Sequence, residues 1–155
     1  MRNFITNLFR PKQKEMRPSL VDPLFGALVF FPAAGLWTGA ARFEPAGREV
    51  EIVIEAGAPG PGETQRVFFG ELAARWPQIQ DAIGAILFPP MKNWAKRGHD
   101  ENNPWNSFDL RGIRIPSLTR EPAEWSISYW CPSAKHHFDV QMSGWVPDGL
   151  DISRA

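Results

Sequence analysis

The residues best suited to chemistry lie near the end of the chain, in the stretch His-His-Phe-Asp-Val-Gln-Met-Ser-Gly-Trp at 136–145. Two histidines beside an aspartate are typical of metal ligands and of acid–base groups. Neighbouring residues on a strand point to opposite faces, so His136 and His137 cannot bind one ion together. His137 and Asp139 share a face, but zinc needs three or four ligands, and the only other histidine is His99. A metal-dependent hydrolase using His99, His137 and Asp139 is therefore kept as an alternative.

Two other stretches carry incomplete motifs. Cys131 precedes Pro132 at the end of an apolar strand, with no helix N-terminus to activate it, which favours a structural thiol. The glycine-rich residues 57–62 precede a helix, but two of them are prolines without an N–H, and no Gly-Lys-Ser/Thr follows. The chain also lacks a Gly-x-Ser-x-Gly elbow. We therefore expect no catalytic residue, no metal and no cofactor.

An acidic ladder is the first candidate binding surface. Glu49, Glu51 and Glu55 alternate with valine and isoleucine, so they should share one wet face of a strand. Such a ladder is usually only a solvated face, but it can also meet a basic partner. Together with His137 and Asp139 it forms the polar sheet face that we predict to bind.

The second candidate surface is the segment 92–107, which lacks periodicity and is rich in asparagine and charge. We expect a long loop there, with room for one helical turn. Trp94 and Trp105 are candidate contacts, because tryptophan is a frequent interface anchor and long loops often carry function. Both tryptophans would alternatively pin the loop to the core.

Composition indicates a globular protein. The chain has 155 residues, of which 43% are hydrophobic and 22% charged, a size and balance typical of one folded domain. Seventeen basic residues balance seventeen acidic ones, which argues against a nucleic-acid partner. A single cysteine excludes an internal disulfide and indicates a reducing compartment, so we expect a cytoplasmic protein.

The N-terminal residues differ from the rest. We expect residues 1–18 to be a basic lead-in that frays like other termini, and residues 19–155 to form the single domain. Five basic residues stand against one glutamate in this segment: Arg2, Arg10, Lys12, Lys14 and Arg17 against Glu15. Its apolar residues have helical spacing but are too few for a signal peptide or a membrane span. A membrane-peripheral accessory module acting through residues 2–17 is a further alternative.

Hydrophobic periodicity predicts the elements that position these residues. Apolar or alternating runs predict strands at 24–31, 36–43, 49–55, 108–115, 124–130 and 135–143. The strand at 108–115 keeps its apolar face only if Arg111 and Gly112 form a bulge. We interpret Asp148-Gly149 as a turn.

Between the third and fourth strands the period changes to that of a helix. One continuous stripe consists of Phe68, Leu72, Trp76, Ile79, Ile83 and Ile86. Pro77 predicts a kink or two abutting helices, and Phe88-Pro-Pro90 should end the helix. The predicted fold is α+β: a twisted antiparallel sheet of about six strands in βββ–α–βββ order, with a long helix packed on one face.

The pattern at both ends of this domain resembles a group of small bacterial domains of unknown function. The shared pattern is Asp-x-x-Phe-Gly-x-Leu, a Trp-x-Gly strand, and a closing His-Phe-x-Val strand with Gly-Trp and Asp-Gly. The matching positions are Asp22, Phe25, Gly26, Leu28, Trp37, Gly39, His137, Phe138, Val140, Gly144, Trp145, Asp148 and Gly149. Related domains are often suspected of being immunity or accessory proteins, and the resemblance implies no catalytic residues. We therefore expect a non-enzymatic bacterial binding protein, immunity-type in character, whose partner is another protein.

Overall fold

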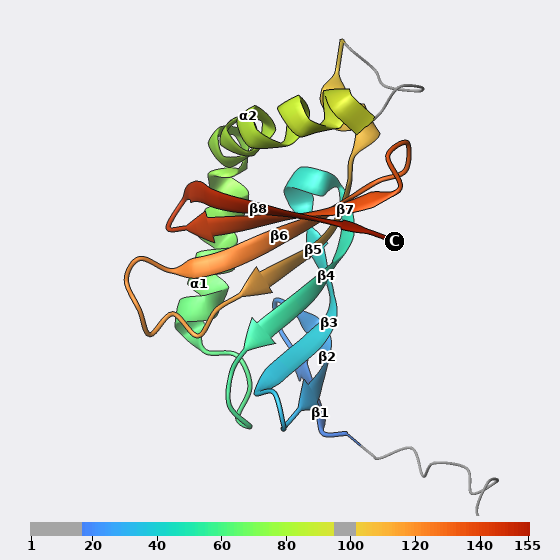
Figure 1. Ribbon diagram of the computed structural model, residues 1–155. Coiled ribbons are helices and arrows are strands. Elements are labelled where there is room, and N and C mark those ends of the chain that lie inside the picture. Colours follow the sequence, from blue (N-terminus) through green and yellow to red (C-terminus); the bar gives the residue numbers. More distant parts are fainter. Residues whose placement is uncertain (1–16, 95–101) are drawn as a thin grey trace, which may run out of the picture.

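The computed structural model describes residues 17–94 and 102–155, without the side chains of residues 92–94. One twisted sheet carries both long helices on the same side (Figure 1). Its strands are β1 (Ser19–Asp22), β2 (Gly26–Phe31), β3 (Leu36–Phe43), β4 (Arg48–Glu55), β5 (Asp109–Ile115), β6 (Glu124–Cys131), β7 (His136–Ser143) and β8 (Val146–Arg154). The helices are α1 (Glu63–Ala74) and α2 (Trp76–Trp94), with single 3₁₀ turns at Glu44–Ala46 and Pro104–Ser107.

Within the described residues the strands lie side by side in the order in which they occur along the chain. Each neighbouring pair is antiparallel except β4 and β5, which run parallel because α1 and α2 form the crossover between them. The α+β class and the helical cover of one face are confirmed. The six-stranded antiparallel sheet in βββ–α–βββ order is wrong: two antiparallel meanders of four strands meet at one parallel pair.

The first additional strand arises because the predicted strand at 24–31 begins later than expected. One oxygen of Asp22, Oδ1, accepts hydrogen bonds from the backbone N–H groups of Leu24 at 2.8 Å and Phe25 at 3.0 Å. These bonds form a turn, and Gly26 completes it with φ of +72°. The chain before the turn then pairs with β2 as the short edge strand β1.

The second additional strand, β8, includes the Asp148-Gly149 dipeptide that we had interpreted as a turn. The turn lies earlier, at Gly144, whose φ is +57°. After it, Leu150 pairs with Val140 and Ile152 with Phe138, and both side chains pack against the core. This apolar contact outweighs the weak local preference of Asp-Gly for a turn.

The two helices confirm the break at Trp76-Pro77, since α1 ends at Ala74 and α2 begins at Trp76. The predicted stop at Pro89-Pro90 is wrong, because α2 continues to Trp94. Leu87 and Met91 are both fully buried, so the last turns are held on the core despite the missing hydrogen bonds. Among the described residues neither helix combines the length and hydrophobicity that crossing a bilayer requires.

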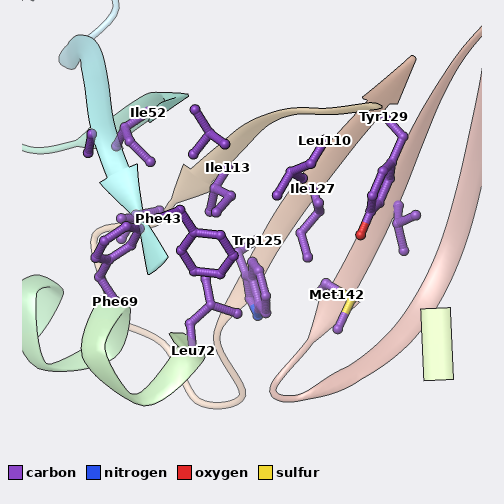
Figure 2. Packing of buried hydrophobic residues seen from close by; sticks show 14 of the residues in the cluster. Phe43, Ile52, Phe69, Leu72, Leu110, Ile113, Trp125, Ile127, Tyr129 and Met142 are labelled. Carbon is purple, nitrogen blue, oxygen red and sulfur yellow. The ribbon is translucent and has the colours of Figure 1, made fainter. Parts of the chain in front are cut away.

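Aromatic side chains dominate the core between helices and sheet. The ring of Phe69 on α1 lies 5.7 Å from that of Phe43 on β3, and Phe68 meets Trp125 of β6 at 5.3 Å. Figure 2 shows Phe69 and Leu72 of α1 facing Phe43, Ile113 and Trp125 of the sheet. The same helix therefore packs against strands from both meanders.

A buried glutamine ties the start of α1 to the parallel pair. Gln65 is 3% exposed, and its Nε2 donates to the carbonyl of Glu55 at 2.8 Å and to that of Pro116 at 2.7 Å. Its Oε1 accepts from the N–H of Gly62 at 3.1 Å, which caps the helix. One side chain thus satisfies the end of β4, the residue after β5 and the helix N-terminus.

A buried ion pair fixes the first meander to the same helix. Asp22 is 3% exposed, and its Oδ2 accepts from Nη2 of Arg66 at 2.7 Å and from Nε at 3.0 Å. Burial raises the pKa of Asp22, but the hydrogen bonds from Arg66 and from two backbone N–H groups outweigh it, so the pKa lies below its ordinary value.

Replacing Gln65 by leucine should lower the free energy of unfolding by about 3 kcal/mol, because two buried carbonyls and a helix N–H lose their partner. Chemical denaturation measures this loss. Gln78→Leu, the same substitution at an exposed position of α2, is the control and should change stability by less than about 0.5 kcal/mol. Equal effects of the two substitutions would contradict the role of Gln65.

Asp22→Asn should destabilise the protein by about 2 kcal/mol at neutral pH, because the charge-assisted bonds to Arg66 are lost. Since the folded-state pKa of Asp22 is depressed, its contribution is complete above the unfolded value of 3.8 and disappears as pH falls through the folded-state pKa. The difference between wild type and variant should therefore shrink below about pH 4. Denaturation at a series of pH values tests this, with the exposed Asp81→Asn as control; a difference independent of pH would refute it.

Candidate functional site

The face of the sheet turned away from the helices is the candidate functional surface, and we call it the open face (Figure 1). Polar residues from successive strands form a row across it, because each lies opposite the next in the strand register. The row consists of Glu51, Gly112, Ser128, Asp139 and Asp151, from β4 to β8. The alternation that buries the core side chains of these strands places this row on the opposite side.

A hollow of about 340 Å³ lies on this row, and we call it the polar hollow. It is lined by Glu51, Val53, Arg111, Gly112, Ile113, Arg114, Ser126, Ser128, Asp139, Gln141 and Asp151. Gly112, Ser126 and Ser128 are short, so the centre of the sheet is low there, whereas longer side chains stand around them. The hollow is thus a product of residue size on neighbouring strands.

The predicted bulge shapes one side of the polar hollow. The β5–β6 register shifts between Leu110 and Gly112, which leaves Arg111 as the extra residue and confirms the bulge. Nη2 of Arg111 lies 3.5 Å from Oδ2 of Asp109. Asp109 lies outside the lining, so this pairing draws the guanidinium toward the margin of the hollow.

The second arginine is also paired outside the lining. Nη2 of Arg114 donates to Oε1 of Glu55 at 2.6 Å, and Nε donates to the same oxygen at 3.2 Å. Glu55 itself lines a neighbouring hollow of about 390 Å³ with the loop 116–120, Ala123 and Glu124. The guanidinium groups of both arginines therefore neutralise carboxylates outside the polar hollow rather than those inside it.

Two carboxylates of the polar hollow accept hydrogen bonds from uncharged donors. Ser128 donates its hydroxyl hydrogen bond to Asp139, and Nε2 of Gln141 donates to Oδ2 of Asp151 at 3.3 Å. Glu51 is exposed and has no side-chain hydrogen bond or ion pair to any residue that the structure describes. The hollow therefore presents negative charge to whatever meets it.

The carboxylates of the polar hollow do not converge on one point. Glu51 and Asp139 are separated by three strand spacings, about 14 Å, so they cannot share one ion. Residues 17–94 and 102–155 hold no group of three histidine, cysteine, aspartate or glutamate side chains able to bind a metal. His99 of the alternative metal site lies outside the described residues.

The residues that we predicted to bind on the sheet face differ in their position relative to the polar hollow. Glu51 and Asp139 line it, and Glu55 is joined to it through Arg114. Glu49 and His137 lie on the open face but outside the lining, and the His137 ring packs against Trp130 with centroids 4.6 Å apart. Two of the predicted side chains, Glu51 and Asp139, thus line the same hollow without contacting each other.

The tryptophans predicted as contacts have different positions. Trp105 is half-buried, with its ring 5.0 Å from that of Phe88 and 5.6 Å from that of Tyr129, so it attaches the segment after residue 101 to the core. Trp94 ends α2, and its side chain is not among those described. Cys131 is fully buried, in the position of a structural thiol.

Sequence reasoning missed several residues of the polar hollow. Ser126 and Ser128 could have been found, because they alternate with Trp125, Ile127 and Tyr129 on the predicted strand at 124–130. Asp151 could not, because its strand had not been recognised. Their meeting on one row depends on strand order and register, which local patterns do not encode.

Compared with family models, with curated proteins and with solved structures, the chain matches none of them. The resemblance to small bacterial domains therefore stays a prediction.

Proposed function

We propose that the chain is a non-enzymatic binding protein that recognises another protein through the polar hollow on its open face. The observation that carries the proposal is the row of residues across five adjacent strands, which no described helix covers, and in which Asp139 accepts from Ser128 and Asp151 accepts from Gln141. Side chains fixed before binding lose little conformational entropy when a partner arrives. An immunity-type role in the bacterial cytoplasm is the form of this proposal that the resemblance and the single cysteine favour.

The size of the surface supports a macromolecular partner. Eight strands at about 4.8 Å spacing give a sheet roughly 34 Å wide, comparable with the breadth of an ordinary protein–protein interface. The hollow at its centre would receive projecting side chains, and the carboxylates favour basic ones. Electrostatic complementarity of this kind increases association rates and selects against acidic partners.

Charge reversal at the rim tests the proposal. In Glu51→Lys/Asp151→Lys both substituted residues are exposed, and Glu55 is left intact so that its bonds to Arg114 persist. We expect the double variant to bind its partner at least tenfold more weakly, which corresponds to about 1.4 kcal/mol. The partner is captured from a bacterial lysate, identified, purified and titrated by calorimetry.

Glu71→Lys/Asp81→Lys is the matched control, because it makes the same charge change at exposed positions on the helices. Thermal unfolding should give similar midpoints for both double variants. Equal affinities of the two variants would exclude the polar hollow as the interface. Failure to capture any stoichiometric partner with the wild-type protein would count against a binding function.

A further inference from the structure

The other half of the open face is apolar, and no element of the described chain covers it. Val21, Ala27, Val29, Phe31, Leu36 and Val53 make up this region, which we call the apolar strip. Val21 is 83% exposed and Val29 38%, while Phe31, Leu36 and Val53 are half-buried. Val29 lies opposite Thr38, which lies opposite Val53, so the strip crosses from β1 to β4. A surface that gathers several apolar side chains, interrupted only by Thr38 on β3, indicates a contact site more strongly than single exposed residues do.

The N-terminal end of the described chain lies on this strip. The N–H of Phe30 donates to the carbonyl of Pro18 at 2.8 Å, which holds the chain beside β2. The guanidinium carbon of Arg17 then lies 4.0 Å from the centre of the Phe31 ring, a cation–π contact. The described chain therefore begins at the strip, where Arg17 lies against Phe31.

The segment that precedes Arg17 has a composition that complements the open face. Residues 1–16 contain four basic residues against one acidic residue, together with the apolar residues Phe4, Ile5, Leu8 and Phe9. On β4, next to the strip, Glu49 and Glu51 point to the same face and form no ion pair among the described residues, since Arg42, which lies opposite Glu49, is paired with Glu44. The segment and the surface are thus complementary in charge and in hydrophobicity.

We propose that residues 2–16 dock on the apolar strip of their own chain, with their basic side chains toward Glu49 and Glu51. Sixteen extended residues reach about 53 Å, whereas the strip from β1 to β4 is only about 15 Å wide. Because the segment is tethered at Arg17, its effective concentration at the strip is in the millimolar range, which favours it over a second copy. The docking itself does not depend on the partner proposed for the polar hollow, whereas the competition described next rests on that proposed function.

The docked segment would lie beside the polar hollow, and Glu51 belongs to the margins of both surfaces. Basic side chains that approach Glu51 would compete with the basic groups of a partner. The segment would then act as an internal competitor that sets how strongly the open face binds other proteins.

Paramagnetic relaxation in the full-length protein tests the docking. A nitroxide label is attached to Ile5→Cys, since the native Cys131 is fully buried and should not react. Amides of Val29, Thr38 and Val53 should lose at least half of their intensity, whereas amides along the exposed side of α2 should not. Loss of intensity on neither face, or to the same extent on both faces, would overturn the proposal.

Two variants test whether the apolar side chains of the strip are required for docking. Val29→Lys/Val53→Lys places charge in the strip and should abolish the loss of intensity at Thr38, while Val67→Lys, at an exposed valine of α1, should leave it unchanged. A mixture of nitroxide-labelled protein at natural isotopic abundance with ¹⁵N protein that carries no nitroxide shows whether the loss of intensity arises between molecules. If the broadening in this mixture is as large as in the labelled ¹⁵N protein, the strip binds a second copy. If the broadening requires anionic vesicles, the segment binds a lipid surface. Either result overturns intramolecular docking.

Discussion

One buried amide, that of Gln65, sits where the two halves of this protein are joined. The parallel contact of β4 with β5 is the only place where the two four-stranded meanders of the described chain meet within the sheet. Gln65 bonds to the carbonyl of Glu55 and to that of Pro116, just past the ends of these strands, and also begins α1. An apolar side chain of the same size would fill the space but leave these groups without partners. One residue therefore links the start of α1 to the chain at the ends of both strands of the join.

The polar row on the open face exists because this join places residues of both meanders side by side. Glu51 comes from the first meander, whereas Ser128, Asp139 and Asp151 come from the second. Gly112 lies at the seam, where a Cβ would approach the carbonyl oxygen of Glu51 to 3.3 Å, so a larger residue would crowd the neighbouring strand. The absence of a side chain at Gly112 thus accounts both for the low centre of the polar hollow and for the close approach of the parallel strands.

Local patterns predicted much of the fold and less of the site. The approximate positions of six of the eight strands, the bulge at Arg111-Gly112 and the break before Pro77 follow from alternation and from proline chemistry, and the structure confirms them. Two predictions failed because tertiary burial overrides local preference. Burial of Met91 keeps α2 helical beyond Pro89-Pro90, and the packing of Ile152 keeps β8 extended beyond Asp148-Gly149. Register across the seam brings Glu51 and Asp139 onto one row, and no short stretch of sequence contains that information.

The connection through both helices has a consequence for the order of folding. Each meander consists of hairpins whose strands are close in sequence, so their loops close at little entropic cost and form early. The contact of β4 with β5 must wait until the whole crossover has been ordered, which makes it a late, non-local event. Before that contact forms, the inner edges of both meanders are unpaired and expose their backbone groups. We therefore expect the seam to be the last part to assemble and the place where an incompletely folded chain would be most prone to associate with another.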